Sequence, residues 1–592
     1  MAPPHAFACD CPVLPLPRLV HEVVPVREVV LGDRGGWDDG VLRLGTIDAA
    51  VLAEEPLVAD ARIDLIPPHG RAVPTDTIVD VMPLAAKREG AVGSGVSRVA
   101  RGVVLVLTGR DESGEQIGEF GHSAGILAEQ MAGDAAGTPD ADDWIVRVAV
   151  TLRSGVAMER AGPWAAHRVA DRVAATLRRT LLAAPEEAVA ERHVYEGARP
   201  GGLRIVLVKE VMGQGAMHDN LLLPREPGGV DGGRSVIDLG NVPVVLRANE
   251  VRDGALHSMC CVGPSTKETT LHYFRDPLLA VLADDPQVDL LGVVVFGSPA
   301  AERDKRFVAE RVGAAVHAMG ADGAILATEG FGNNHIDFGL ALKDIAAYGT
   351  PCVGVTWAAR QGRLVTGNEY MVALVEVNRS ADGRESRVLA ENTARSGDAR
   401  RATAMLKSVM AGIGVLPAPS DWDPAVVSEN ARLVEEEATF MGGVPSATAG
   451  LRSEAPVPTI QPSALASLSL PLAHSRVALV TASGAYVRGQ APFDRAGDHS
   501  FREVPADTPG DRIAFGSGGY DHSDVNRDPN CMLPLDCLRK LVAAGDVGGA
   551  TEAHIGFQGG GGDIDQIRDR LAPAVVDRLK QRHADAVLLT GG

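Results

Sequence analysis

Aromatic residues, cysteines and basic residues are all scarce in this chain of 592 residues. Aromatic side chains make up 4% of the sequence, while Gly, Ala and Val are abundant, which is typical of closely packed α/β layers. Seven cysteines are too few for a disulfide scaffold. A cysteine in a distinctive motif is therefore a candidate for a reactive role. The 77 acidic residues outnumber the 57 Lys and Arg, and this net charge of −20 disfavours nucleic acid as a partner.

Long apolar runs, targeting signals and metal-binding motifs are lacking as well. No segment has the length and purity of a membrane-spanning helix. Residues 1–17, "MAPPHAFACDCPVLPLP", are interrupted by prolines and have no basic region leading into an apolar core. We therefore expect a cytoplasmic protein with no membrane span and no signal peptide. Cys9 and Cys11 lack a second pair of ligands, so no metal site is predicted.

The sequence pattern divides the chain into four parts. Residues 1–195 contain strand-like runs such as "VARGVVLVLTG" and then a helical run, "AAHRVADRVAATLRRTLLAA", with its arginines expected on the outer face. Residues 196–440 alternate strands and helices, which predicts a parallel sheet covered by helices. Residues 441–472 form a Pro/Ala/Ser linker, and residues 473–592 a second, truncated α/β domain. The predicted fold class is α/β with a β-rich N-terminal region, and the last strand, 584–589, is expected to be buried.

Two adjacent thiols, Cys260 and Cys261, lie in the run "HSMCCVGPSTKET". A thiol can attack the carbonyl group of its own preceding peptide bond, and elimination and hydrolysis then leave a pyruvoyl group. That ketone is an electrophile made from the chain itself. The alternative is a pair of buried, inert cysteines beside a turn, and the spacing alone favours this alternative.

Two glycine-rich stretches are candidates for ligand binding. "GQGAMHDN" contains His218 and Asp219, which could bind a ligand or transfer a proton; an ordinary glycine-rich loop with a surface histidine is the alternative. "HIGFQGGGGD" contains four consecutive glycines, which suit an anion-binding nest or the close approach of a partner's active site better than a flexible linker. These substrate-contact or subunit-contact candidates are Gly559, Gly560, Gly561 and Gly562.

A fourth stretch, "TEGFGNNHIDF", follows a predicted strand and precedes a predicted helix. Asn333 or Asn334 could cap this helix, which is expected to start near Ile336. Capping accounts for the asparagines but not for Glu329 and His335 beside them. These two side chains are therefore candidates for a site at the carboxyl edge of the sheet, and the asparagines for substrate or subunit contacts.

Taken together, these runs resemble the D-proline reductase family, within the broader group of glycine/sarcosine/betaine reductase component B. Residues from about 195 to 415 resemble the pyruvoyl-forming proprotein through "VLVKEVMGQGAMHDN", "DGALHSMCCVGPSTKET" and "TEGFGNNHIDF". Residues from about 474 to 592 resemble the separate selenocysteine subunit through "GGYDHSDVNRDPNCMLPLDCLR" and "HIGFQGGGGD". The chain is therefore expected to be a fusion of two subunits.

The resemblance implies two cofactors. Cleavage before Cys261 would turn this residue into the covalent pyruvoyl group, although Cys260, which stands where the family has Thr, leaves the cleavage register open. Selenocysteine is expected immediately after Gly592, because in the family it follows the strand that resembles "DAVLLTGG" and its UGA codon is read elsewhere as a stop. A natural, selenium-free truncation is the rival account.

The activity that the resemblance implies is reductive cleavage of the C–N bond of D-proline to 5-aminovalerate. The pyruvoyl group would take up the amine, a selenol would attack the α-carbon, and a dithiol or a protein electron donor would supply the electrons; a homo-oligomer is expected. His218, Asp219, Glu329 and His335 are candidates for proton transfer or substrate orientation. The truncated chain is expected not to reduce its substrate. The alternatives are a component B-like glycine, sarcosine or betaine reductase and a non-catalytic amine-binding homologue.

Overall fold

The computed structural model divides the chain into two compact units, residues 1–449 and 450–592, and each unit is considered by itself. The described residues are 17–47, 54–118, 123–158, 161–196, 201–214, 221–230, 241–258, 268–299, 301–328, 334–357, 368–371, 373–379, 386–391, 393–413, 468–494, 498–516, 523–558 and 566–591.

The first unit begins with a mixed six-stranded sheet in which the order is β11-β1-β8-β10-β5 and β7 pairs with β8. Runs of Val, Leu and Ile form the central strands, and on one face of the sheet their side chains pack against the helix α3 (Ala161–Leu182). The prediction that the arginines of this helix face outward is wrong for Arg178, which is buried because Asp171 and the Ala85 carbonyl accept hydrogen bonds from it. The strands of this sheet are β1 (Leu19–Pro25), β5 (Val58–Ile66), β7 (Thr77–Glu89), β8 (Gly95–Asp111), β10 (Trp144–Leu152) and β11 (Glu191–Tyr195).

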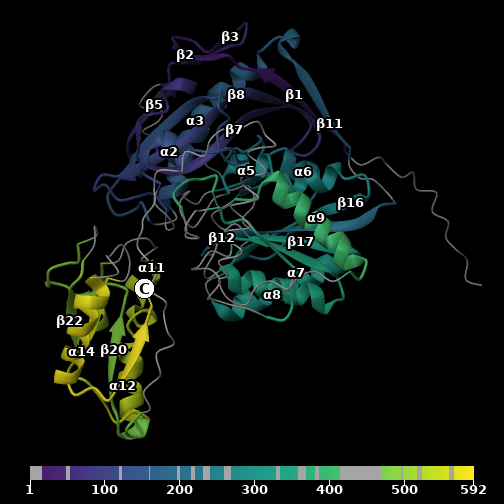
Figure 1. Ribbon diagram of the computed structural model, residues 1–592. Coiled ribbons are helices and arrows are strands. Elements are labelled where there is room, and N and C mark those ends of the chain that lie inside the picture. The colour runs from purple at the N-terminus through teal and green to yellow at the C-terminus, as the bar shows by residue number, and fades with distance from the viewer. Residues whose placement is uncertain are drawn as a thin grey trace, which may run out of the picture. The chain divides into compact units, whose positions relative to one another are not determined.

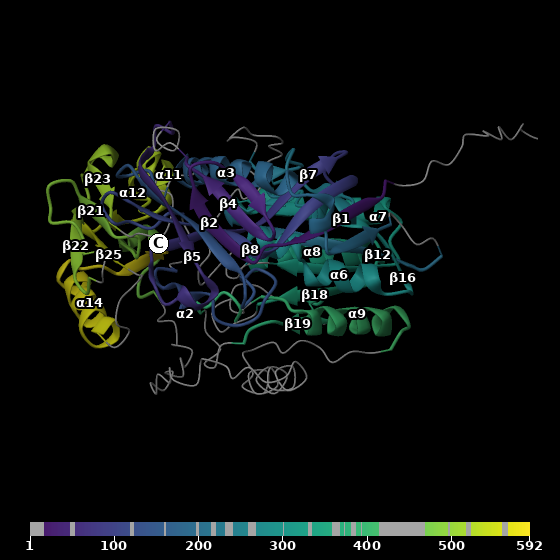
Figure 2. The same ribbon diagram turned by 90° about the horizontal axis from the view of Figure 1, so that it is seen from above.

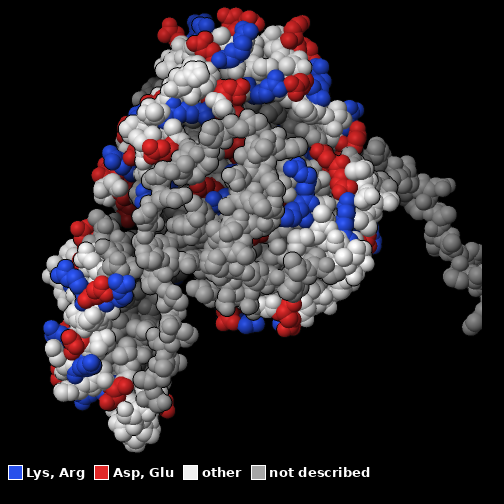
Figure 3. Space-filling model, viewed as in Figure 1, with Lys and Arg blue, Asp and Glu red and all other residues white. Residues whose placement is uncertain are grey.

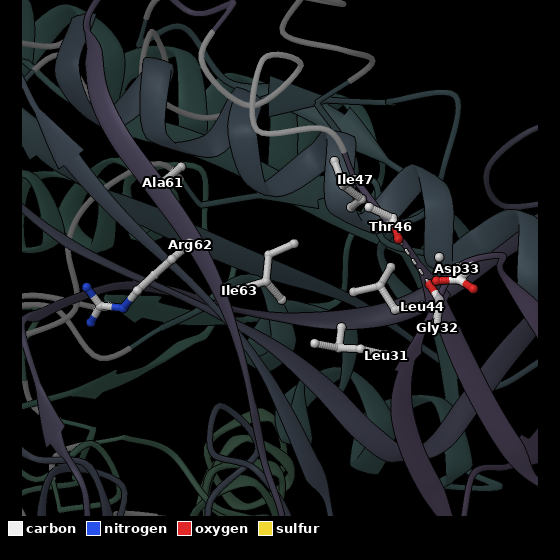
Figure 4. Close-up of a pocket in the computed structure, with 10 residues that line it drawn as sticks. Leu31, Gly32, Asp33, Leu44, Thr46, Ile47, Ala61, Arg62 and Ile63 are labelled. Atoms are coloured by element: carbon white, nitrogen blue, oxygen red, sulfur yellow. Dashed lines mark hydrogen bonds between the residues drawn. The ribbon is translucent and has the colours of Figure 1, made fainter.

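A groove of about 500 Å³ lies beside this sheet, between a small three-stranded sheet and β5 (Figure 4). Its lining is largely apolar, with Leu31, Leu44 and Ile63 in it and only Asp33 and Arg62 ionisable. None of the residues singled out from the sequence lines this groove. The small elements of the region are β2 (Glu28–Gly32), β3 (Gly36–Asp38), β4 (Val41–Gly45), β6 (Pro74–Thr75), β9 (Gly125–Ile126) and α2 (Leu127–Gln130).

A second six-stranded sheet has the order β14-β16-β12-β17-β18-β19, and only β14 runs antiparallel to its neighbour. Its central strands are the near-continuous apolar runs expected of a parallel sheet buried on both faces. The predicted α/β class with a β-rich N-terminal region is therefore confirmed. The strands are β12 (Leu203–Gln214), β14 (Val244–Leu246), β16 (Val288–Ser298), β17 (Gly323–Thr328), β18 (Cys352–Thr356) and β19 (Leu374–Glu376), with a separate pair β13 (Leu221–Leu222) and β15 (Leu256–His257).

Helices cover both faces of this parallel sheet, with α6 and α9 on one face and α7 and α8 on the other (Figure 1). Glycines at positive φ follow α7 and α8, at Gly320 and Gly349, as is common just after the end of a helix. The short helix α5 packs against β7, so the N-terminal sheet lies on the α6 side of the parallel sheet (Figures 1 and 2). The helices are α4 (Ala248–Arg252), α5 (Thr270–Phe274), α6 (Pro277–Asp284), α7 (Glu302–Ala318), α8 (Asn334–Ala347) and α9 (Ser396–Met410).

The strand order places a topological switch point beside β12. The chain leaves β12 toward the α6 face before it enters β16, whereas it leaves β17 toward α8 on the opposite face. Connections that diverge in this way open a crevice at the carboxyl ends of the two strands, where open α/β sheets bind their ligands. The ends of β12 and β17 are therefore the first place to seek a site.

The second unit contains a five-stranded sheet in which β20 pairs in parallel with β24, β25 and β26. The prediction that the last strand is buried is wrong: β26 pairs only with β20 among the described strands, and Leu589 is 72% exposed. No described helix of either unit is long and apolar enough to cross a membrane. The elements are β20 (Arg476–Thr481), β21 (Ala485–Val487), β22 (Phe501–Pro505), β23 (Ile513–Phe515), β24 (Gly549–Ala550), β25 (Ala553–Phe557), β26 (Ala586–Thr590), α11 (Ser523–Arg527), α12 (Leu535–Ala544) and α14 (Ala572–Gln581).

Candidate functional site

Four polar side chains stand at the carboxyl ends of neighbouring parallel strands. They are Glu210 on β12, Ser298 on β16, Thr328 on β17 and Thr356 on β18. Successive side chains of a strand alternate between faces, and the residues two positions before each of the first three belong to the apolar core under α7 and α8. Glu210 is also the direct ladder partner of Thr328. The strand ends therefore present polar groups to one face, beside the switch point.

Glu210 is fully buried and incompletely hydrogen-bonded. Asn334, at the start of α8, donates from Nδ2 to Oε1 of Glu210 at 3.4 Å. Oε2 of Glu210 has no hydrogen-bond partner within the described part of the chain. Burial, and then the charge of Asp337, raise the pKa of Glu210 well above its usual value. A neutral carboxylic acid at this edge can donate a proton, as a general acid does.

An ion pair lies next to this acid. Lys305 Nζ, on α7, is 2.5 Å from Oδ2 of Asp337, and the Ser298 hydroxyl donates to the same oxygen at 2.6 Å. Burial raises the pKa of Asp337, although Lys305 opposes this shift. At the end of the next strand, β18, the Thr356 hydroxyl lies 2.8 Å from Nε2 of His335, a residue of α8. The edge thus combines an acid, an ammonium group and an imidazole, all buried.

Replacing Glu210 with glutamine is expected to stabilise the protein at high pH. A carboxyl group with a raised pKa in the folded state does not lower the free energy of unfolding while the pH is below its unfolded pKa of about 4.3. As the pH rises above that value, the free energy of unfolding falls. Glu210→Gln, which cannot ionise, should therefore be more stable than the wild type at pH 8 and nearly equal to it at pH 4.5. Urea unfolding at both pH values measures this, with the exposed Glu187→Gln as the control. A larger loss at pH 8 than at pH 4.5 would mean that Glu210 is ionised and paired.

The neighbouring residue on β12, Lys209, points to the other face and is the centre of a second buried cluster. Its Nζ lies 2.8 Å from Oε1 of Glu268 and 3.0 Å from Oδ2 of Asp276. His272 Nε2 lies 3.2 Å from the same oxygen of Glu268. Although burial opposes both shifts, Asp276 and Glu268 raise the pKa of Lys209, and Lys209 and His272 lower that of Glu268 to about 2. Lys209 and Glu268 therefore form an ion pair, which ties β12 to the residue that follows segment 259–267.

A third buried cluster joins β7 to the residues on either side of segment 259–267. Thr270 donates to Asp80 from its hydroxyl at 2.6 Å and from its backbone N–H at 2.9 Å, and the Thr270 hydroxyl accepts from the Ser258 N–H at 3.0 Å. His257 Nδ1 lies 3.0 Å from the Gly228 carbonyl, and its Nε2 lies 3.0 Å from Nδ1 of His167. Because a carbonyl only accepts, Nδ1 of His257 carries a proton and its Nε2 accepts from His167.

Asp80, His167 and His257 are of the types that bind metal ions, and one ligand atom of each lies within 4.8 Å of the others. Burial lowers the pKa of His257 to about 4 and lowers that of His167, so both rings are neutral. The ring nitrogens that face one another are already joined by a hydrogen bond. A hydrogen-bond network therefore accounts for these contacts without a metal ion.

Of the residues predicted from the sequence, the structure describes Asn334 and His335. Both lie at the sheet edge, where α8 starts at Asn334, two residues before the expected start, and the Asn334 amide contacts Glu210. The buried Glu210 carboxyl provides the acceptor for that amide, which the helix-capping interpretation did not include. The other candidates lie outside the described residues: Cys260, Cys261, His218, Asp219, Glu329, Asn333 and residues 559–562.

Sequence reasoning missed most members of these clusters, among them the four charged residues Asp80, Lys209, Glu210 and Lys305. A signal for three of them was present, because "TIVDVMPL" and "RIVLVKEV" carry charged residues inside apolar strand runs. Charged side chains are rarely buried unless they are paired. Lys305 had no such signal, since it stands in an ordinary charged first turn of a helix.

Comparison with known proteins finds a matching family model for each of the two units. The family model described as glycine/sarcosine/betaine reductase component B subunits matches residues 18–381, and the model for glycine/sarcosine/betaine reductase selenoprotein B matches residues 451–592. No solved structure matches the chain.

Two curated relatives come from Acetoanaerobium sticklandii. The D-proline reductase proprotein is 43% identical over 384 residues, which are 64% of this chain and 61% of the relative. The D-proline reductase subunit gamma is 41% identical over 143 residues, 24% of this chain and 59% of the relative. The glycine reductase complex component B subunits alpha and beta of the same organism are 23% identical over 368 residues, 57% of this chain and 79% of the relative. The chain thus spans about three fifths of the length of the first two relatives.

These matches follow the two resemblances seen in the sequence, with a proprotein-like first part and a second part like a separate subunit. The first family model alone covers more than half of the chain. The chain therefore belongs to the family of glycine/sarcosine/betaine reductase component B subunits.

Proposed function

We propose that this protein catalyses the reductive cleavage of the C–N bond of D-proline to 5-aminovalerate. The observation that carries this proposal is the difference in identity between two groups of relatives. Identity is 43% and 41% to the D-proline reductase proteins but 23–29% to the glycine, sarcosine and betaine reductase proteins. The reaction consumes two electrons and two protons, and a dithiol that is oxidised to a disulfide supplies both.

The electrophile in this proposal is a pyruvoyl group made from Cys261. The described residues around segment 259–267 suit such a group, because Ser258 and Thr270 are joined by a hydrogen bond and Glu268 is tied to the end of β12. The residues on either side of the segment are therefore linked to each other, and Glu268 is also linked to Lys209 near the end of β12. When present, the group would supply a carbonyl that an amine can attack and that withdraws electrons from the C–N bond.

The chain's own residues would handle the proton and the substrate. Breaking the C–N bond releases an amine, which needs a proton, and the neutral carboxyl of Glu210 is suited to hold one in the crevice. Lys305 and Asp337 form a buried ion pair beside Glu210, and removing either residue would leave the charge of the other without a partner in that pair. His335, held by Thr356, is a second candidate for orientation or proton transfer. The roles of His218, Asp219 and Glu329 in proton transfer or substrate orientation stay predictions.

The nucleophile in this proposal is a selenol associated with the second unit. This unit matches a family model that is described as a selenoprotein, and its relative is a separate subunit of D-proline reductase. A selenol is ionised at neutral pH and is a strong nucleophile toward carbon. The expectation that selenocysteine follows Gly592 and the expected homo-oligomer both stay predictions.

A component B-like glycine, sarcosine or betaine reductase is the second candidate, because the matching family model carries that description. The two are separated by incubating the purified chain with D-proline, L-proline, glycine, sarcosine or betaine in turn and adding sodium cyanoborohydride to fix bound amine. The intact mass of the fragment that begins at residue 261 is then measured.

D-proline alone is expected to increase that mass. An increase with glycine or sarcosine and none with D-proline would contradict the proposed substrate. An intact chain that binds D-proline without forming any fragment would instead support a non-catalytic amine-binding homologue.

A further inference from the structure

Two buried carboxyl groups at the carboxyl edge of the parallel sheet each have one oxygen without a hydrogen-bond donor. Oε1 of Glu210 accepts from the Asn334 amide at 3.4 Å, whereas Oε2 has no donor among the described residues. Oδ2 of Asp337 accepts from Ser298 at 2.6 Å and from Lys305 at 2.5 Å, whereas Oδ1 has no donor from any residue that the structure describes. Glu210 is 0% exposed and Asp337 is 1% exposed. Because buried acceptors without a donor are costly and rare, these two oxygens indicate a ligand that donates hydrogen bonds.

The two carboxyl groups lie together beside the first turn of α8. Asn334 and Asp337 are three residues apart in this helix, so they share one of its faces, and Asn334 contacts Glu210 directly. Burial raises the pKa of Glu210, and the charge of Asp337 raises it further, which also shows that the two groups are close. The unpartnered oxygens therefore belong to one cluster, at the strand ends where open α/β sheets bind their ligands.

The charges of this cluster suit a cation as the ligand. Lys305 balances the charge of Asp337, which leaves Glu210 as a neutral acid beside the pair. The other titratable group at this edge is His335, whose Nε2 lies 2.8 Å from the Thr356 hydroxyl. A bound cation that displaced the proton of Glu210 would give two carboxylates and two cations. Buried charges are tolerated when they are paired in this way.

We propose that Oε2 of Glu210 and Oδ1 of Asp337 form an ammonium subsite, which binds the protonated nitrogen of the amine substrate while Glu210 releases its proton. The proposal deepens the proposed function and rests on it, because it names the part of the substrate that the described edge recognises. The nitrogen of D-proline is a secondary ammonium group with two N–H donors, one for each unpartnered oxygen. A quaternary ammonium group has none, so the ammonium subsite selects against betaine.

The ammonium subsite also gives Glu210 a defined place in the proton transfers. Once ionised, its carboxylate lies against the nitrogen that it has bound. It can take the proton that this nitrogen must lose before it acts as a nucleophile, and it can return that proton to the nitrogen after the C–N bond breaks. The carboxyl group gains one proton and loses one proton over the two steps, so this exchange needs no oxidant or reductant.

The test is calorimetric titration of the full chain carrying Cys261→Ala with D-proline. This variant lacks the proposed pyruvoyl precursor, so only non-covalent binding is measured. Titrations at pH 7.5 in phosphate and in Tris, whose ionisation enthalpies differ, give the number of protons released. We expect about one proton per bound D-proline. Glu210→Gln in the same background should release none and should bind D-proline about tenfold or more weakly.

A pH series separates this role from a structural one. The affinity of the Cys261→Ala chain for D-proline should rise between pH 5.5 and pH 8.5, because the ligand cation competes with the proton of Glu210. With Glu210→Gln added, the affinity should not change over this range. The matched control is Glu302→Gln, since Glu302 is an exposed residue of α7 that pairs with Arg306. This control should keep both the affinity and the proton release.

Two analogues of proline test the N–H donors. Cyclopentanecarboxylate has the ring and the carboxylate group of proline but no nitrogen. It should release no proton and should bind at least about tenfold more weakly than D-proline. N-methyl-D-proline has one N–H donor in its protonated form, so its affinity should lie between those of the other two.

The outcomes distinguish this inference from the proposed function. D-proline binding without proton release, or with equal affinity after Glu210→Gln, would overturn the ammonium subsite, and so would the absence of any amine binding at tens of millimolar. In these cases adduct formation on the wild-type chain could still support the proposed function. Proton-linked binding of glycine or sarcosine but not of D-proline would keep the ammonium subsite and overturn the proposed substrate.

Discussion

Replacing Cys261 with alanine should leave the chain in one piece. The proposed cleavage needs a thiol on the residue that follows the broken peptide bond, and alanine has none, so the expected loss is complete. Cys260→Ala is the matched control: it removes the adjacent thiol, keeps the Cys261 nucleophile and should still cleave. Denaturing gels and intact mass measure both variants, and the wild type should give two fragments that meet near residue 260.

The pair of variants also decides the cleavage register, which the sequence leaves open. Cleavage in Cys261→Ala combined with an intact chain in Cys260→Ala would move the nucleophile to Cys260. Cleavage in both single variants but not in the double variant would mean that either thiol can act. An intact wild-type chain that retains all its sulfur would contradict the pyruvoyl proposal.

Replacing Lys209 with methionine is expected to cost about 3–5 kcal/mol of folding stability at pH 7.5. The reason is that Glu268 and Asp276 would remain buried after losing the cation that they share. Methionine fills a similar volume, so the loss reflects charge more than packing. Urea unfolding followed by circular dichroism measures the difference, with the exposed Lys343→Met as the control.

The pH dependence of this loss has a definite sign. In the wild type, the lowered pKa of Glu268 increases the free energy of unfolding at pH values above the pKa of this residue in the unfolded chain. This increase is lost as the pH falls toward about 2. Without Lys209, Glu268 can relieve its burial by taking up a proton, so the deficit should shrink between pH 7.5 and pH 5. A deficit that is independent of pH would indicate lost packing instead.

The alternation of strands and helices in the parallel sheet could be predicted from the sequence because each buried strand is an unbroken apolar run. "RIVLVKEV" became β12 and "DGAILATEG" became β17, and the helices α7 and α8 are each followed by a glycine at positive φ. The last strand was misjudged because an apolar run cannot show whether a strand is central or at an edge. β26 is equally apolar but has a partner on only one side among the described strands.

The clusters could not be predicted because their members are far apart in the chain. Asp80 and Thr270 are 190 residues apart, and His167 and His257 are 90 residues apart. Only the tertiary fold brings such pairs together, and no periodicity in one sequence records it. What the sequence did offer was the presence of single charged residues inside apolar strands, at Asp80, Lys209 and Glu210.

The surface adds little to the site. Acidic and basic side chains are interspersed over the described part of the face in Figure 3, so the net charge of −20 is spread rather than gathered at one place. The groove beside β5 is open and largely apolar, without the converging ionisable groups seen at the ends of β12 and β17. The chemistry is therefore best sought at the carboxyl edge of the parallel sheet.

The position of β12 has a consequence for the two fragments. β12 precedes residue 260, while its ladder partners on both sides, β16 and β17, follow residue 261. A cut between these residues would divide the polypeptide but not the folded body, because the shorter fragment is threaded through the middle of the longer fragment's sheet. A strand of one fragment would thus lie between two strands of the other in this interleaved sheet. Halves synthesised as separate polypeptides would have to fold around each other to recreate it.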